Sequence, residues 1–388
     1  MEELPVIPIT IGDMRFNRTG LWRFLTPVVR DQSAPCRRAC PLGMPTPAFI
    51  NDLIAADVVQ ALARILEVNP LPGVTGRLCY HPCQTDCLRR SLDRPVRIQL
   101  LEQYVADTTP APVGDRERDG TKGRGALLGA GPLGLTAAYF LARAGLRVTV
   151  FDPLDRPGGF LIGLEEKQLP TGVLARETAR LAWLAGLEMR LNADPGTFGD
   201  AEPDVAWDLI LYDRTAHPAG GKEAALLAGM AERLSRSHTV LDTEDLSPAQ
   251  GYKASQVALA VAAGRELAAR ALRALGLEDE VPIGASGPSA GPVSREELRY
   301  DVLAAQAGRD TGARNEVSSP AQAREEAELC FSCGRCNLCG RCLLFCPDVS
   351  IRADEERQRP IVDLEHCKGC GICARECPRR VIVMERVS

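Results

Sequence analysis

The sequence predicts a multidomain α/β protein with a helical domain rich in cysteine, a Rossmann-like middle domain and a small C-terminal α+β domain. Its 388 residues are enough for two or three domains. Five of the fifteen cysteines lie between residues 36 and 87, and ten lie in the last sixty residues. Between these groups, a glycine-rich turn follows a short apolar segment, as at the start of a dinucleotide-binding fold.

Composition excludes several classes of protein. The formal net charge is −5 and aromatic residues make up 5% of the chain, so neither charge nor base stacking points to nucleic acid. No apolar run approaches the roughly 20 residues of a membrane-spanning helix, and the first ten residues lack the basic start of a signal peptide. Cysteines in such a chain favour metal binding over disulfides, and we expect a cytoplasmic protein.

The N-terminal part carries helical signals between its cysteines. Thr46 before Pro47 predicts a helix start, and apolar residues then recur at helical spacing from Ile50 to Leu66. A second helix is predicted over residues 96–106. The cysteines that flank these helices are Cys36, Cys40, Cys79, Cys83 and Cys87. His81, between two of them, is a further candidate ligand.

The middle domain shows the start of a Rossmann-like fold. An apolar strand over residues 126–128 leads into Gly129-Ala130-Gly131-Pro132-Leu133-Gly134, a G-x-G-x-x-G turn. A helix over residues 135–144 and a strand over 147–151 are predicted to follow. Asp152 then lies 23 positions after Gly129, where an acidic partner for a ribose hydroxyl is expected. These elements together predict a dinucleotide site.

The C-terminal cysteines have the spacing of a two-cluster bacterial-type ferredoxin. The pattern C-x2-C-x2-C-x3-C-P occurs twice, and in such runs the fourth cysteine of each run ligates the other cluster. The predicted ligand sets are Cys336, Cys339, Cys342 and Cys377 for one cluster, and Cys367, Cys370, Cys373 and Cys346 for the other. Gly369 and Gly371 are expected to let backbone amides point at the sulfurs. Zinc also binds C-x2-C pairs, but two complete runs favour [4Fe-4S] clusters.

Two stretches resemble the iron-sulfur and flavin domains of glutamate synthase small subunits and dihydropyrimidine dehydrogenase. The first resemblance lies in residues 34–41, 76–79 and 95–98, together with Cys83 and Cys87. The second lies in the glycine turn, in residues 155–159 and in Leu169-Pro170. The resemblance implies FAD, held by Gly129, Gly131, Pro132, Gly134, Asp152, Gly158, Gly159 and Asp245.

The chain departs from those families in two ways. It contains no second G-x-G-x-x-G turn, so the NAD(P)H domain of the family is predicted to be lost. Glu244 stands where the family has a glycine before Asp245, and a glutamate there could obstruct a flavin. A bound FAD and a degenerate, empty nucleotide fold therefore both remain open.

The same resemblance implies two further clusters. One would be held by Cys40, Cys79, Cys83 and Glu102, although Glu102 could instead be an exposed helix acid. The other set lacks its usual upstream C-x2-C pair, and the unused Cys330 and Cys333 are predicted to replace it beside Cys36 and Cys87. All fifteen cysteines then serve four clusters, or about sixteen iron atoms. Buried thiols without metal, or a cluster shared with a partner, are the alternatives.

The two ends of the chain resemble a different family. Residues 17–23 and 27–29, together with the C-terminal cysteine runs, resemble the delta, ferredoxin-like subunit of 2-oxoacid:ferredoxin oxidoreductases. The resemblance implies an electron-transfer subunit of a 2-oxoacid:acceptor oxidoreductase, with the thiamine-dependent core on a partner. The alternatives are a stand-alone NAD(P)H:ferredoxin-type flavoprotein and a non-catalytic scaffold. No catalytic acid, base or nucleophile is predicted.

These inferences divide the chain into six segments. An N-terminal docking extension covers residues 1–35, a helical iron-sulfur domain 36–107 and a linker 108–125. An FAD-type domain without an NAD(P)H insert covers residues 126–270. A second linker, 271–324, leads to the 2[4Fe-4S] ferredoxin domain at 325–388.

Overall fold

The structure is a computed structural model that describes residues 18–109, 121–183, 186–193, 207–235, 240–244, 246, 252–278, 298–308, 312, 315–356 and 359–386. The chain forms two compact units. The larger unit comprises residues 36–288 and 309–329, and the smaller unit combines residues 1–35, 289–308 and 330–388. The smaller unit is therefore built from both ends of the sequence.

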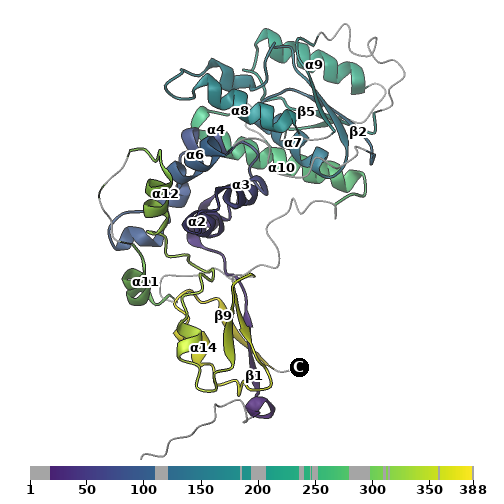
Figure 1. The fold of residues 1–388 in the computed structure, drawn as a ribbon. Helices are drawn as coiled ribbons and strands as arrows, with labels where there is room; N and C mark the ends of the chain where they lie inside the picture. The colour runs from purple at the N-terminus through teal and green to yellow at the C-terminus, as the bar shows by residue number, and fades with distance from the viewer. Residues whose placement is uncertain are drawn as a thin grey trace, which may run out of the picture. The chain divides into compact units, whose positions relative to one another are not determined.

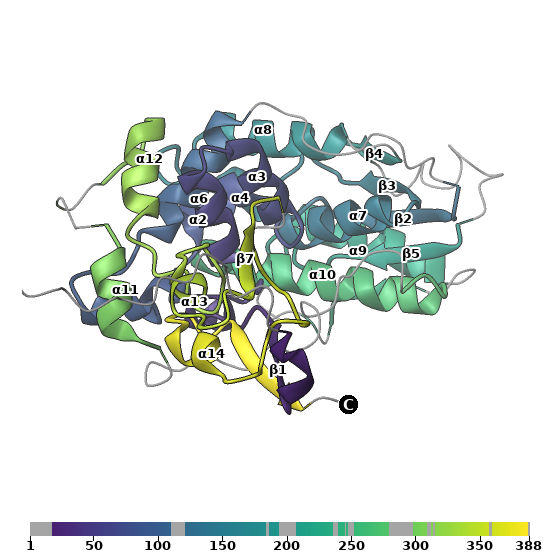
Figure 2. The ribbon, with the colours of Figure 1, turned by 60° about the horizontal axis from the view of Figure 1, so that its bottom comes forward.

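A parallel sheet of five strands organises the larger unit. Its strands are β2 (Arg124–Leu128), β3 (Arg147–Phe151), β4 (Leu187–Arg190), β5 (Leu209–Tyr212) and β6 (Val240–Asp242). The strand order is β4-β3-β2-β5-β6, and Figure 2 shows the first four side by side. Because the strands run parallel, their carboxyl ends meet at one edge, where Leu128 lies beside Phe151 and Tyr212. Ligands of this fold class bind at that edge.

Helices cover both faces of the sheet. One face forms a core with α9 (Lys222–Ser235), made up of Ala126, Leu128, Ile210, Tyr212, Leu227 and Met230. On the other face, α7 (Pro132–Arg143) packs along α10 (Val257–Ala274). A methyl group on Gly264 would lie 2.3 Å from the Leu133 carbonyl oxygen, so only glycine permits this close approach. The remaining elements of this domain are η4 (Gly159–Gly163), α8 (Thr171–Ala182) and η5 (Ala254–Gln256).

Short helices make up the rest of the larger unit. They are α1 (Pro35–Ala39), α2 (Thr46–Ile54), α3 (Val58–Leu66), α4 (Pro72–Leu78), α5 (Pro82–Thr85), η3 (Leu88–Ser91), α6 (Ile98–Thr108) and α12 (Pro320–Ala327). The periodic run from Ile50 to Leu66 is divided between α2 and α3. Ala56 has a φ of 61°, and Asp57 starts the next helix by accepting a hydrogen bond from Gln60 N at 2.9 Å. Apolar spacing alone does not reveal such a break.

Helices also form inside the segment 271–324, which the sequence predicts to be a linker. They are α11 (Tyr300–Gln306) and the first part of α12. Ser319 caps α12 by accepting a backbone hydrogen bond at 3.3 Å, and Pro320 is the first helical residue. Glu326, which is 2% exposed, accepts two hydrogen bonds from Arg94 at 2.8 Å each. This buried ion pair holds α12 in the larger unit.

In the smaller unit, a strand near the start of the chain pairs with one near its end. Strand β1 (Leu25–Val29) lies antiparallel to β9 (Ile382–Arg386), and Figure 1 shows the two side by side. Strand β7 (Ile351–Asp354) lies antiparallel to β8 (Arg359–Val362). The unit also contains η2 (Thr19–Trp22), α11, α13 (Arg341–Leu344) and α14 (Ile372–Glu376). A methyl group on Gly20 would lie 2.3 Å from the Leu364 carbonyl oxygen. Residues 18–29 are therefore an integral part of this unit.

Candidate iron-sulfur and dinucleotide sites

The smaller unit contains two cavities that are each lined by four cysteines. The first is bordered by Cys336, Cys339, Cys342 and Cys377. The second is bordered by Cys346, Cys367, Cys370 and Cys373. Three cysteines of each set come from one sequence run and the fourth comes from the other. The structure therefore brings together the two crossed sets that the spacing predicts.

The protonation of these thiols depends on metal. Burial raises the pKa of Cys342 to about 12 and that of Cys373 to about 11, and the neighbouring cysteines add to both shifts. Without a cation, both thiols are protonated at neutral pH. Iron would favour their thiolate forms, so cluster binding at these cavities should release protons. A group of converging, buried thiols of this kind fits a [4Fe-4S] cluster.

Backbone conformation turns amide groups toward the sulfurs. Ser350 N donates a hydrogen bond to the Cys346 sulfur at 3.4 Å. Gly369 and Gly371 have φ values of 73° and 78°, in the left-handed region that glycine adopts readily. At Gly369 there is a second reason for glycine, since a methyl group would lie 2.3 Å from the Leu25 carbonyl oxygen of β1. The second cysteine loop is therefore shaped by a strand from the other end of the chain.

A third group of candidate ligands lies in the larger unit and consists of Cys40, Cys79, Cys83 and Glu102. Burial raises the pKa of Cys79 to about 11, and the negative charges of Glu102 and Cys40 raise it further. Burial also raises the pKa of Cys83, and Cys40, Glu102 and Cys79 contribute to that shift. Because Glu102 and Cys40 both raise the pKa of Cys79 and of Cys83, the four groups lie in one environment, as the resemblance implies.

Glu102 is buried at this site. It is 6% exposed, and its Oε1 accepts hydrogen bonds from Thr75 Oγ1 at 2.5 Å and from Asn69 Nδ2 at 3.0 Å. Burial raises its pKa to about 7. The alternative of an exposed helix acid is therefore wrong. The sequence contained a signal for this burial, because Glu102 lies on the apolar stripe formed by Ile98, Leu101 and Val105.

Replacing Glu102 should affect one cluster and leave the ferredoxin pair unchanged. In Glu102→Ala, Thr75 and Asn69 lose a buried acceptor, at a cost of about 1–3 kcal/mol for each unsatisfied group, and the site loses its oxygen ligand. Glu102→Gln keeps a carbonyl oxygen and should retain the cluster with shifted EPR g values. Iron counts and EPR spectra of the reduced variants measure both effects. An unchanged spectrum for Glu102→Ala would remove Glu102 from the ligand set.

The remaining four cysteines are divided between the two units. Cys36 and Cys87 belong to the larger unit, and Cys330 and Cys333 belong to the smaller one. All four side chains are partly buried. Their grouping around one cluster stays a prediction.

One recurrent turn links Cys330 to the other candidate ligands. The backbone N–H two residues after Cys79, Cys330 and Cys336 donates to the sulfur at 3.3, 3.3 and 3.4 Å. The donating residues are His81, Ser332 and Leu338, with φ values of 51°, 51° and 53°. Residues other than glycine adopt this left-handed conformation infrequently. At Cys79, the backbone N–H of His81 therefore donates a hydrogen bond to the sulfur.

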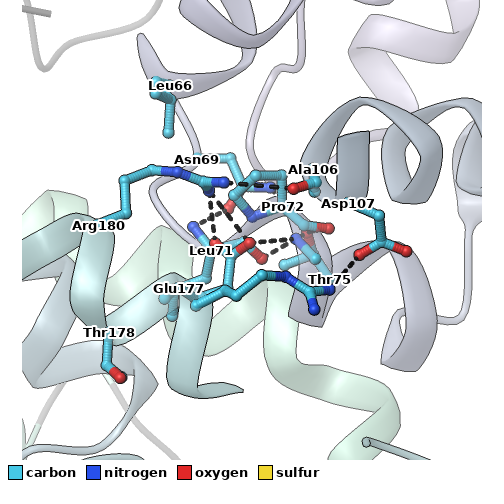
Figure 3. Close-up of polar contacts among 12 residues, drawn as sticks. Leu66, Asn69, Leu71, Pro72, Thr75, Ala106, Asp107, Glu177, Thr178 and Arg180 are labelled. Atoms are coloured by element: carbon cyan, nitrogen blue, oxygen red, sulfur yellow. Dashed lines mark hydrogen bonds and ion pairs between the residues drawn. The ribbon is translucent and has the colours of Figure 1, made fainter. Parts of the chain in front are cut away.

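A buried ion pair that the sequence analysis missed joins the Rossmann-like domain to the helical region. Glu177 and Arg180 of α8 are 1% and 7% exposed. Arg180 Nη1 donates to both Glu177 oxygens at 3.1 Å, and its Nη2 donates to the Ala106 carbonyl of α6 at 3.3 Å (Figure 3). Glu177 also accepts a hydrogen bond from Gly73 N of α4 at 3.2 Å. This network fixes α8 against the helices that border the third ligand group.

The predicted dinucleotide residues meet at the carboxyl edge of the sheet. The structure places around one turn Gly129, Gly131, Pro132, Gly134, Asp152, Gly158 and Gly159. Ala130 N donates to Asp152 Oδ2 at 2.7 Å, and the Ala130 carbonyl accepts from Gly158 N at 2.8 Å. Asp245 lies outside the described residues.

The space in front of this turn is taken by the segment after β5. A methyl group on Gly131 would lie 2.8 Å from the Ala216 Cα, and Asp213 Oδ2 accepts a hydrogen bond from Gly134 N at 3.0 Å. Asp152 is fully buried, so its carboxylate is not presented to a ribose. The resemblance implies FAD here, but the residues do not fit it in this arrangement, because the second glycine meets the protein's own chain instead of a pyrophosphate.

Three family models match consecutive parts of the chain. Residues 29–112 match dihydropyrimidine dehydrogenase domain II, 4Fe-4S cluster. Residues 128–168 match the NAD(P)-binding Rossmann-like domain, and residues 335–381 match the 4Fe-4S dicluster domain. The predicted multidomain α/β class is confirmed, with a helical iron-sulfur region, a parallel Rossmann-like sheet and a C-terminal dicluster ferredoxin domain.

Curated relatives match part of the chain at about one third identity. The NADP(+)-dependent formate dehydrogenase subunit beta of Moorella thermoacetica is 33% identical over 225 residues, which is 51% of this chain and 31% of the relative. The NAD-dependent dihydropyrimidine dehydrogenase subunit PreT homolog of Salmonella typhi is 34% identical over 168 residues, 42% of this chain and 40% of the relative. The glutamate synthase (NADH) of Schizosaccharomyces pombe is 35% identical over 163 residues, 40% of this chain and 8% of the relative.

The chain covers less than half the length of each of these relatives. Within the part of the chain that the structure describes, no helix has the length and apolar character needed to cross a membrane. The chain combines iron-sulfur domains with a Rossmann-like domain and is similar to subunits of NAD- and NADP(+)-dependent dehydrogenases.

Proposed function

We propose that this chain is an electron-transfer subunit of an NAD(P)-linked oxidoreductase. The observation that carries the proposal is the pair of four-cysteine cavities, each completed by a cysteine from the other sequence run. Clusters held in this way accept and release electrons one at a time. The third ligand group, around Glu102, would hold a further cluster in the larger unit.

The NAD(P) link has more support than a 2-oxoacid reaction. The three relatives reported above are named for NADP(+) or NAD, and none of the three is a 2-oxoacid oxidoreductase. The residues that resemble the delta subunit have a structural role here, because η2 and β1 complete the ferredoxin unit. Their presence therefore does not point to an oxoacid substrate.

Nicotinamide chemistry belongs on a partner subunit in this proposal. The sequence has a single G-x-G-x-x-G turn. That turn is filled by Asp213 and Ala216. A partner would therefore bind NAD(P) and carry out hydride transfer, and this chain would carry the electrons onward.

Exposed apolar side chains beside the second cysteine set support assembly with a partner. Leu21, Trp22 and Phe24 are 96%, 62% and 87% exposed. Arg23, between them, donates hydrogen bonds to the carbonyl oxygens of Leu364 and Cys367. Apolar groups with this exposure are typical of a protein contact. We assign this edge to the partner that exchanges electrons with the second cluster.

The isolated, cluster-loaded chain should not be reduced by NADH or NADPH, whereas the complex with its partner subunits should be. Hydride transfer requires the nicotinamide within roughly 3–3.5 Å of the accepting atom, and the filled glycine turn offers no place for it. Stopped-flow absorbance of the anaerobic chain and of the complex from native cells measures the difference. Rapid bleaching of the isolated chain would contradict the proposal.

Phe24→Ser is a variant that tests the contact within the same experiment. It should slow cluster reduction in the complex through weaker association, without changing the iron content of the chain. Val59→Ser is the matched control, since Val59 is 56% exposed on α3 of the larger unit. Equal effects of the two substitutions would argue against a contact at Phe24.

A further inference from the structure

The segment Asp213–His217, directly after β5, fills the dinucleotide end of the Rossmann-like domain. Two glycines approach its Ala216 closely. A methyl group on Gly131 would lie 2.8 Å from the Ala216 Cα, and one on Gly159 would lie 2.2 Å from the Ala216 carbonyl oxygen. Gly131 has the position at which this fold lets the backbone meet a pyrophosphate. Here the protein's own backbone stands in that place.

Asp213 supplies the hydrogen-bond acceptor that a phosphate would bring. Its Oδ2 accepts a hydrogen bond from Gly134 N, in the first turn of α7, at 3.0 Å. Its Oδ1 accepts from Thr215 N at 2.9 Å and from Thr215 Oγ1 at 2.7 Å. An anion at this position is stabilised by the N–H groups and the dipole of the helix. Because Asp213 is 1% exposed and has three donors, it is a fixed part of the fold.

Asp152, the acid expected to bind a ribose hydroxyl, is likewise bound to groups of the protein itself. It accepts hydrogen bonds from Ala130 N at 2.7 Å and from Leu154 N at 2.9 Å. Its two oxygens also lie 3.1 and 3.0 Å from His217 Nε2. The segment after β5 therefore covers the ribose end of the site as well as the phosphate end.

Charge and space both oppose a dinucleotide at this turn. Asp213 and Asp152 place two buried carboxyl groups there, and a pyrophosphate would bring its negative charge beside them where water does not screen it. The domain does have an apolar cavity, of about 380 Å³ and partly open to solvent, between η4 and α8. That cavity is lined by Leu161, Leu169 and Leu174 among others, and the glycine turn does not border it.

We propose that Asp213–His217 is a built-in occupant of the dinucleotide site and that this chain uses its Rossmann-like domain without FAD or NAD(P). The domain then acts as a rigid support, which positions α4 and α6 around the third ligand group through Glu177 and Arg180. Electrons pass through this chain only by way of clusters, an electron route that rests on the proposed function. The two-electron step belongs to a partner.

Cofactor analysis of the full-length, cluster-loaded chain tests this inference. After anaerobic purification and acid extraction, we expect far less than one FAD or NAD(P) per chain. Calorimetric titration with FAD and with ADP should show no saturable binding. Extraction of one dinucleotide per chain, or saturable binding of either probe, would overturn the inference. Neither result depends on electron transfer to a partner, so the proposed function can stand if this inference fails.

Asp213→Ala tests the role of the carboxylate itself. Gly134 N and Thr215 N lose their buried acceptor in this variant. For a unit of this size, the melting temperature should fall by roughly 2–4 °C for each kcal/mol of stability lost. Asp213→Asn keeps an acceptor oxygen, so its melting temperature should fall less. The matched control is Asp208→Ala, because the exposed Asp208 also accepts a backbone hydrogen bond, from Arg124 N at 2.8 Å.

Equal melting temperatures for Asp213→Ala and Asp208→Ala would overturn the assignment of Asp213. If Asp213→Ala does not fold, the dinucleotide content of the unmodified chain decides the question alone.

Discussion

Removal of iron should unfold the smaller unit and leave the parallel sheet of the larger unit folded. One core cluster of the smaller unit consists of Ile351, Cys373, Cys377, Val381 and Ile382, with Cys336, Cys342 and Cys346 packed against it. Candidate ligands are therefore a large part of that core. Its strands have only four or five residues each. Without clusters to join these short elements, too little apolar surface is buried to keep the unit folded.

Hydrogen-exchange mass spectrometry before and after anaerobic chelation measures this effect. Peptides from β1, β7 and β9 should lose protection together, because β1 pairs with β9. Peptides from β2, β3 and β5 should keep theirs. Reconstitution with iron and sulfide controls for irreversible damage and should restore the first group. Persistent protection of β9 in the iron-free chain would show that the protein core alone holds the unit together.

Arg180→Leu should lower the free energy of unfolding of the larger unit by about 3–5 kcal/mol, the usual effect of removing one partner of a buried ion pair. Burial raises the pKa of Glu177 to about 7, and Arg180 opposes that shift. Without Arg180 the pKa of Glu177 rises further above 4.5, its ordinary value in the unfolded chain. The folded variant then binds a proton more tightly than the unfolded one. Below pH 7 Glu177 is protonated in both folded proteins, so the destabilisation should be small there and should grow as the pH rises above 7.

Urea unfolding of the larger unit at mildly acidic and mildly alkaline pH tests this prediction. The control is Arg176→Leu, one turn earlier on α8, where a half-exposed arginine pairs with Asp107 at 2.7 Å. Its loss should cost at most about 1 kcal/mol. The double variant Glu177→Gln, Arg180→Met leaves no buried charge and should recover much of the stability. Equal losses for the Arg176 and Arg180 variants would rule out the buried pair as the cause.

Two parts of the structure could be predicted because their signals are local in sequence. The spacing within Cys336, Cys339 and Cys342 confines three thiols to one tight loop, and the same spacing recurs in the second run. The strand, glycine turn and helix around Gly129 follow one another within about twenty residues, so the sequence also predicts them. For both, covalent geometry limits the structures that the segment can form.

The features that were missed depend on contacts between distant segments. Asp213 bonds to Gly134 across 79 positions, and Glu177 bonds to Gly73 across 104. No periodicity connects such pairs. One signal was available for Asp213, since it directly follows an apolar strand and the carboxyl ends of parallel strands share an edge. In the same way, Glu326 is tied to Arg94 across 232 positions, which places α12 in the larger unit.

The pairing of β1 with β9 also sets an order of assembly. Residues 25–29 are synthesised well before residues 382–386, so the pairing of Val29 with Ile382 cannot form until the chain between them has been made. The larger unit is encoded between these strands and can fold first. Closing the long intervening loop remains feasible, because its entropic cost grows only with the logarithm of length. The Leu25 carbonyl therefore reaches the Gly369 loop only after the larger unit has been synthesised, so the machinery that inserts iron and sulfide at the second cavity acts on a chain whose larger unit is already made.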